Sequence, residues 1–81
     1  MALEILKTAS KVIGIKQVTK VVNKGLANQV FFATDADERV LEPLKVLCME
    51  KNIEMLEVPT MLELGEACGI EVGAAAAAAL K

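Results

Sequence analysis

The chain of 81 residues contains no histidine, tryptophan or tyrosine. The lack of histidine excludes acid–base chemistry that relies on an imidazole group near neutral pH. The only aromatic residues, Phe31 and Phe32, are adjacent in the sequence. Neighbouring side chains of a strand point to opposite faces, so this pair does not form a platform on which nucleic-acid bases could stack.

Cysteine is also scarce, because Cys48 and Cys68 are the only two in the chain. No CxxC motif is present, and without histidine the ligand spacing of a zinc site is missing. We therefore interpret both cysteines as small buried apolar residues. No metal and no cofactor are expected.

No segment has the features of a signal peptide, since charged and apolar residues alternate at the start of the chain. The apolar run 73–80 is too short to span a membrane. With 54% apolar residues, the chain is expected to fold as one domain, residues 1–81. We expect a monomeric protein of the cytoplasm with no membrane partner.

Positive charge is in overall deficit, and the net charge of −2 argues against a protein that coats RNA or DNA through a basic field. No DNA partner is expected. Residues 1–24 nevertheless hold five lysines and one glutamate, a charge of +4, which leaves −6 for residues 25–81. This asymmetry suits one local contact with an anion. The alternative is an ordinary solvated charged surface.

Apolar residues at helical spacing predict three longer helices. The first covers residues 2–10 and the second 16–24. The third is expected to begin at Pro43, where the missing N–H is harmless, and to end near Lys51, with Asn52 in the left-handed conformation. The apolar side of the third helix consists of Leu44, Leu47 and Cys48.

A short helix is predicted after residue 60. Thr60 can cap it, and Glu63, three residues later, completes a capping box. Gly65 and Gly69 are then expected to bracket a loop that allows close approach of the backbone.

Runs of β-branched, aromatic and other apolar residues predict strands at 12–13, 29–34 and 54–58. The alanine run 74–79 gives conflicting signals, because alanine is the best helix former but its small side chain also suits a central strand covered on both faces. We predict a strand there. The alternation of helices and strands predicts an α/β domain with helices on both faces of a sheet.

The predicted helix at 16–24 is charged along one side, which Gln17 borders. Gly14 before it allows a sharp turn and close approach to a ligand, and Gly25 is typical of a residue that ends a helix. Free N–H groups at its start can bind phosphate, and lysine and glutamine side chains can bond base edges. The charged side consists of Lys16, Lys20 and Lys24.

Three stretches of the sequence form a set. The first is Gly14-Ile15-Lys16-Gln17-Val18-Thr19-Lys20, which resembles G-x-N-E-x-T-K. The second runs from Val30 to Asp37 and then Pro43-Leu44-x-x-Leu47-Cys48, a hydrophobic strand, an acidic turn and a P-x-L-C type of helix. The third is Val58-Pro59-Thr60 followed by Leu64-Gly65-Glu66-Ala67-Cys68-Gly69-Ile70-Glu71-Val72, which fits V-P-S and L-G-x-A-x-G-x-E-V. In this order and spacing they resemble the kink-turn-binding ribosomal protein family that includes L7Ae and L30e.

The resemblance implies an α/β fold, namely a three-layer α/β/α sandwich with a mixed four-stranded sheet. It also implies binding to a kink-turn, a sharply bent RNA with tandem sheared G·A pairs and a flipped-out nucleotide. Lys16, Gln17 and Lys20 would contact guanine edges, Lys24 a phosphate, and the loop at 66–71 the flipped-out nucleotide. The residues expected at the RNA are Gly14, Ile15, Lys16, Gln17, Lys20, Lys24, Glu66, Ala67, Cys68, Gly69, Ile70 and Glu71.

The sequence departs from the family pattern at several positions. Lys16 stands where the family usually has Asn, Gln17 where it usually has Glu, and Glu38 where Pro is common. Glu66 and Glu71 lie in the expected RNA loop, and a carboxylate near phosphate is unfavourable. We expect these two to point away from the RNA or to hold backbone amides of the loop.

Other functions have weaker support in the sequence. An enzyme would have to use Asp35, Asp37, Cys48 or Cys68, but the aspartates suit turn caps and neither thiol has a basic partner. No catalytic residue is therefore assigned, and no enzymatic activity is expected. The alternatives to isolated RNA binding are a structural component of a ribonucleoprotein such as the ribosome, and a protein-interaction domain of the same fold. The lysines favour RNA.

Overall fold

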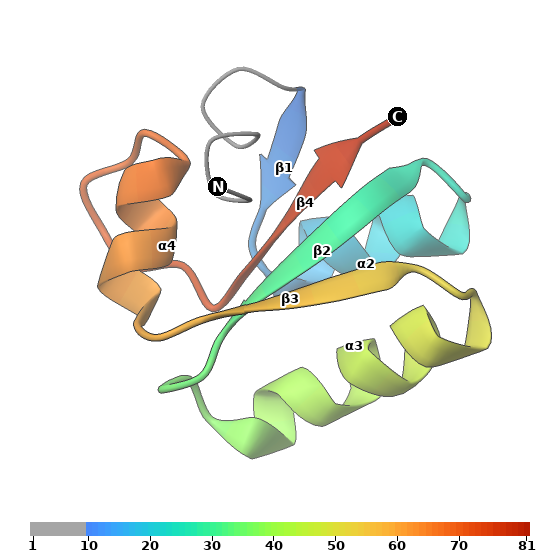
Figure 1. Ribbon diagram of the computed structural model, residues 1–81, viewed down its shortest axis with the longest axis horizontal. Helices are drawn as coiled ribbons and strands as arrows, with labels where there is room; N and C mark the ends of the chain where they lie inside the picture. Colours follow the sequence, from blue (N-terminus) through green and yellow to red (C-terminus); the bar gives the residue numbers. More distant parts are fainter. Residues whose placement is uncertain (1–9) are drawn as a thin grey trace.

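The computed structural model describes residues 10–81, so the helix predicted at 2–10 lies outside the described residues. None of the helices within 10–81 has the length and apolar character needed to cross a membrane. Helices and strands alternate along the chain, as shown in Figure 1. Their order is β1 Lys11–Ile13, α2 Ile15–Asn23, β2 Ala27–Ala33, α3 Glu38–Glu50, β3 Glu54–Val58, α4 Met61–Ala67 and β4 Ala76–Leu80.

The four strands form one mixed sheet in the order β1-β4-β2-β3. Strands β2 and β3 are parallel, whereas β4 is antiparallel to both β1 and β2. Helices α2 and α3 pack on one face of the sheet and α4 packs on the other (Figure 1). The predicted three-layer α/β/α fold is confirmed.

The alanine run forms a strand, as predicted, and it lies between β1 and β2. Ala76 and Ala78 belong to the core under α2 and α3, whereas Ala77 and Ala79 belong to the core under α4. The four side chains are at most 1% exposed. Burial on both sides of a sheet therefore outweighs the helix propensity of alanine, which is a weak preference.

Most bounds lie within two residues of the prediction, but two helix boundaries differ by more. Helix α3 begins at Glu38, five residues before Pro43, because the Asp37 carboxylate caps it by accepting from the backbone N–H of Arg39 at 2.9 Å. Pro43 then lies inside the helix and cannot donate the hydrogen bond that would reach the Arg39 carbonyl. Burial of three α3 side chains offsets this loss. They are Leu41, Leu44 and Cys48.

Gly65 lies within α4, where the sequence predicted the start of a loop. The cap of this helix was predicted correctly, since the Thr60 hydroxyl accepts from the backbone N–H of Glu63 at 3.1 Å. Asn52 adopts the predicted left-handed conformation after α3, with φ 57°, and Gly25 does so after α2, with φ 73°.

Candidate nucleic-acid interface

The helices α2, α3 and α4 all begin at the same end of the sheet. They follow β1, β2 and β3, which run in one direction because β4 is antiparallel to both β1 and β2, and β3 is parallel to β2. The segment at residues 69–75, called here the 69–75 loop, enters β4 at this same end. The backbone N–H of Gly14 donates to the Ala76 carbonyl at 2.9 Å, which fixes the start of α2 beside the end of this loop.

Of these helix starts, the one of α2 is uncapped within residues 10–81. Gly14 occupies the cap position with φ 101°, no side chain in this part of the chain caps the helix, and its first turn contains no acidic residue. The first helical hydrogen bond runs from Val18 to the Gly14 carbonyl at 2.9 Å, so the N–H groups of residues 15–17 have no acceptor within the helix. By contrast, α3 and α4 are capped by Asp37 and Thr60 and carry a glutamate in the first turn. An anion at the start of α2 could therefore accept from these N–H groups.

Helix α2 separates its apolar and charged sides clearly. Val18 and Val22 are fully buried against the sheet and α3. The exposed residues include Lys16, Gln17, Lys20 and, at the C-terminal cap, Lys24. Within residues 10–81 the ion pairs are Arg39 with Asp37 and Lys45 with Glu38, so the α2 lysines have no carboxylate partner there.

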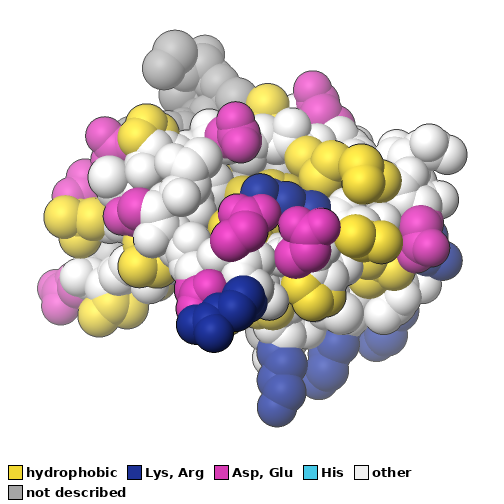
Figure 2. Space-filling model, turned by 90° about the horizontal axis from the view of Figure 1, so that it is seen from below, with side chains coloured by type: hydrophobic (Ala, Val, Ile, Leu, Met, Phe, Trp, Pro, Cys, Tyr) yellow, Lys and Arg dark blue, Asp and Glu magenta, His cyan; other side chains and the backbone are white. Residues whose placement is uncertain are grey.

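A row of basic side chains runs along the lower border of the view in Figure 2, whereas acidic and apolar side chains, with other basic groups between them, cover the face toward the viewer. The structure thus brings the predicted residues of the first motif together on one exposed edge. Ile15 differs from the exposed polar residues of this motif, because its side chain is partly buried against the core beneath α2. Its backbone N–H, rather than its side chain, is available at the helix start.

The second predicted segment is only partly available to a ligand. Glu66, Gly69 and Glu71 are exposed, and Gly69 has φ 82°. Ala67 and Cys68 are 6% exposed and point into the core under α4. These two side chains are therefore not available to a ligand, so a contact with RNA at these two positions would have to be made by the backbone. The sequence does carry a signal for this burial, because Leu64, Ala67 and Cys68 are spaced as one side of a helix.

Ile70 packs against the core under α4 and is partly buried. The apolar side chain that the 69–75 loop does expose is Val72, which is 68% exposed and the most exposed of the large apolar side chains within residues 10–81. The sequence prediction omitted it. A valine between Glu71 and Gly73, outside any strand, could have indicated an exposed apolar contact.

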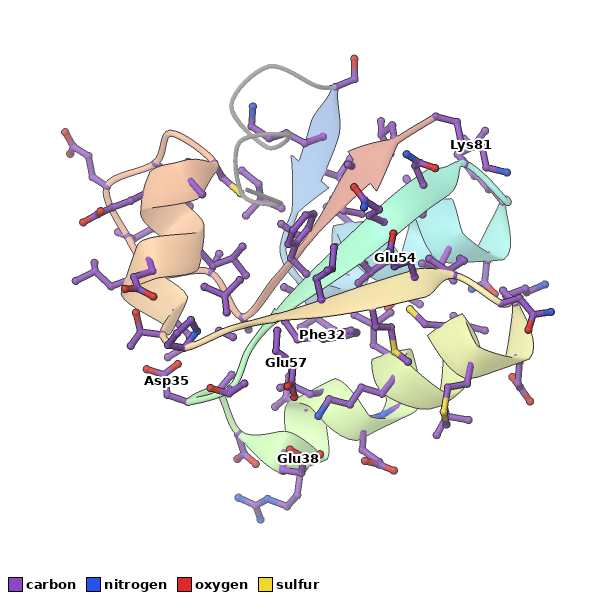
Figure 3. The ribbon with its side chains drawn as sticks, in the orientation of Figure 1. Phe32, Asp35, Glu38, Glu54, Glu57 and Lys81 are labelled. Carbon is purple, nitrogen blue, oxygen red and sulfur yellow. The ribbon has the colours of Figure 1, made fainter. Side chains whose placement is uncertain are left out.

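The candidate catalytic residues have structural roles. The Asp35 carboxylate accepts from the backbone N–H of Met61 at 2.8 Å and so ties the β2–α3 loop to the start of α4. In Figure 3 Asp35 lies beside that helix, away from Glu54 and Lys81. Hydrogen bonds from Arg39 lower the pKa of Asp37.

Burial raises the pKa of both thiols, Cys48 and Cys68, although the charge of Lys11 partly opposes the shift at Cys68. Raised thiol pKa values disfavour the thiolate that a nucleophile needs. No group of three or more acidic or cysteine side chains in the described part of the chain is arranged to hold a metal ion.

A hollow of about 390 Å³ lies between α3 and β3, away from the α2 edge. Lys45 crosses it, with its ammonium 5.9 Å from the centre of the Phe32 ring and 3.2 Å from a Glu38 oxygen. These contacts engage the ammonium of Lys45, one of the two charged side chains that line the hollow. The open start of α2, beside the 69–75 loop, is therefore the stronger candidate site.

Comparisons with known proteins agree with this geometry. The model of the ribosomal protein L7Ae/L30e/S12e/Gadd45 family matches residues 2–81. RNA-binding protein TTE2299 of Caldanaerobacter subterraneus subsp. tengcongensis is 47% identical over 68 residues, 84% of this chain and 83% of the relative. RNA-binding protein YbxF of Geobacillus stearothermophilus is 38% identical over 78 residues, 96% of this chain and 95% of the relative. Among solved structures, the Giardia lamblia 15.5kD RNA binding protein has a TM-score of 0.90 and 28% identity, covering 99% of this chain and 71% of that one.

Proposed function

The chain belongs to the ribosomal protein L7Ae/L30e/S12e/Gadd45 family, and we propose that it is a non-enzymatic RNA-binding protein that recognises kink-turn RNA. The observation that carries this proposal is the uncapped start of α2, flanked by exposed lysines and set beside the 69–75 loop. The names of the similar proteins, RNA-binding in each case, support the same class of ligand.

The open helix start explains how one short edge could bind bent RNA. The N–H groups of residues 15–17 can bond a phosphate, because the helix supplies no acceptor for them. Lys16, Gln17 and Lys20 lie within the first two turns, where their side chains can reach the O6 and N7 acceptors of guanine in the G·A pairs. Lys24, one turn beyond Lys20, is placed for the phosphate backbone.

The 69–75 loop would receive the flipped-out nucleotide. Val72 offers an exposed apolar surface to a base, while Gly69 leaves the neighbouring backbone accessible. Glu66 and Glu71 are exposed and make no side-chain hydrogen bond to this loop within the described residues. We infer that they point to solvent, where their charge disfavours approaches of RNA that do not place a base at Val72.

The proposal also covers the oligomeric state of the protein, its location and its RNA partner. We propose a monomer in the cytoplasm that associates with ribosomal or other structured RNA. The uneven charge supports a local contact over non-specific coating, since the chain as a whole is at −2. Neither DNA nor membrane is proposed as a partner.

A protein-interaction domain of the same fold is the second candidate. The observation in its favour is the exposure of apolar side chains on α3, where Val40, Val46 and Met49 are 45%, 41% and 60% exposed. The exposed lysines of α2, which have no carboxylate partner within residues 10–81, weigh against it, because a surface of that charge favours phosphate.

A titration separates the two candidates. Labelled kink-turn RNA and a plain duplex of equal length are titrated with the protein at several salt concentrations. Kink-turn RNA is expected to bind well over tenfold more tightly. Equal affinity for both RNAs, or no binding to either, would reject kink-turn recognition.

A further inference from the structure

The 69–75 loop is fastened to α4 at both ends. The backbone N–H of Ile70 donates to the Gly65 carbonyl, and that of Ala74 donates to the Met61 carbonyl, each at 3.0 Å. Between these two points the carbonyl group of Val72 rests against Gly65. The loop is therefore held against α4 at three points, while Val72 remains 68% exposed.

Gly65 leaves the space in α4 that the Val72 carbonyl occupies. A Cβ atom at position 65 would overlap the carbonyl oxygen of Val72 and would lie 3.1 Å from its carbonyl carbon. Gly73 meets α4 almost as closely, since a Cβ atom there would lie 3.0 Å from the Cβ of Met61. Gly65 has ordinary helical geometry, so its requirement is for space and not for an unusual backbone conformation.

A glycine inside a helix destabilises it relative to alanine. Gly65 is buried in α4, and the close contact with Val72 gives its presence a physical reason. The protein tolerates this destabilisation of α4 because any side chain at position 65 would keep the loop from approaching the helix so closely.

We propose that Gly65 is a positioning residue of the RNA interface, which holds the Val72 side chain where it meets the flipped-out base. This inference rests on the proposed kink-turn function. Gly65 makes no contact with RNA in this scheme, because it is buried beneath the loop. It acts through the backbone of Val72.

The test compares two kink-turn RNAs, one intact and one in which the flipped-out nucleotide is abasic. The unmodified protein is expected to prefer the intact RNA by about tenfold, which corresponds to about 1.4 kcal/mol, the order expected when a base covers the two methyl groups of Val72. Gly65→Ala is expected to abolish this preference, as is Val72→Ala. The double variant should lose no more than either single one, because both act through one contact.

Cys48→Ala is the matched control for loss of stability. Cys48 is fully buried in α3, on the other face of the sheet from α4, so this variant should keep the tenfold preference. Circular dichroism shows whether each variant is folded. If Gly65→Ala does not fold, Gly73→Ala takes its place, since its milder contact with Met61 predicts a smaller loss of the same preference.

The outcomes separate this inference from the proposed function. A folded Gly65→Ala protein with the full preference would overturn the positioning role. So would an unmodified protein that binds both RNAs alike, although kink-turn binding itself would then stand. If the unmodified protein binds neither RNA, the proposed function fails first.

Discussion

Replacing each of two α2 lysines with alanine should remove a different part of RNA recognition. Lys20 lies within the helix, closer to its open start, whereas Lys24 lies at the C-terminal cap. Lys20→Ala is therefore expected to reduce the preference for G·A pairs, and Lys24→Ala to weaken binding to all RNAs alike. Both proteins should stay folded, because both side chains are exposed.

The expected magnitudes depend on whether a lysine binds a base edge or a phosphate. A good base-edge contact contributes about 1–3 kcal/mol of discrimination, so Lys20→Ala should lower the G·A preference by roughly 5- to 150-fold. A lysine that displaces one counterion makes affinity fall by about 3.5-fold between about 50 and 200 mM salt. Removing the phosphate contact of Lys24 should therefore reduce the total fall in affinity over this range by about 3.5-fold.

The assay is a fluorescence titration with a kink-turn RNA and with a second RNA whose G·A pairs are changed to Watson–Crick pairs, at four salt concentrations. Lys51→Ala is the control, since it removes an equal charge at the C-terminal cap of α3, outside the row of α2 lysines. The base-contact role of Lys20 is refuted if Lys20→Ala weakens binding to both RNAs by the same factor. An effect of Lys51→Ala equal to that of Lys24→Ala would show that total charge, and not position, governs binding.

Three further predictions concern stability and reactivity. Leu44→Ala should lower the unfolding free energy by about 2–5 kcal/mol, because Leu44 is 1% exposed. Leu47→Ala should lower it by less, because Leu47 is only partly buried. Equal losses of unfolding free energy in urea would contradict this. Hydrogen bonds from Arg39 lower the pKa of Asp37 in the folded state. The stability that this carboxylate contributes is therefore present above its unfolded pKa and is lost as pH falls through the lower folded pKa. As pH falls below ~4, the melting temperature of Asp37→Asn should therefore decrease less than that of the unmodified protein. The buried thiols of Cys48 and Cys68, whose pKa is raised, should react slowly with a disulfide reagent at pH 8 and quickly in denaturant; fast native reaction would indicate that they are exposed.

The fold was predictable from the sequence wherever local pattern and burial agree. Strand β3 was predicted with its observed bounds, and β4 was predicted because small side chains suit a strand that is covered on both faces. The start of α3 was wrong because two valid rules compete at that point. Proline favours the first turn of a helix, but the Asp37 cap with Arg39 begins the helix earlier, and the energy of burying the α3 side chains decides between them.

The site was predictable only where it lies on a regular helix. The spacing of the lysines placed them on one side of α2, since a four-residue interval keeps side chains on one helical side. The second segment was harder, because α4 has seven residues and its end cannot be separated from a loop by periodicity. Burial of Ala67 and Cys68, and the exposure of Val72, depend on how α4 packs on β2 and β4, which is long-range information.

A protein with a net charge of −2 can still bind RNA if the contact is small. The molecule extends over 30 × 27 × 20 Å, whereas charges are screened within about 8 Å at physiological salt. A phosphate at the start of α2 therefore interacts mainly with the helix N–H groups and the nearby lysines. Glutamates in the first turns of α3 and α4 lie at the same end of the sheet, so a long straight duplex across this end would meet carboxylates as well as lysines. The proposed bent RNA would need to bring only phosphate, guanine edges and a flipped-out base to α2 and Val72, which is a contact small enough for the lysines to dominate.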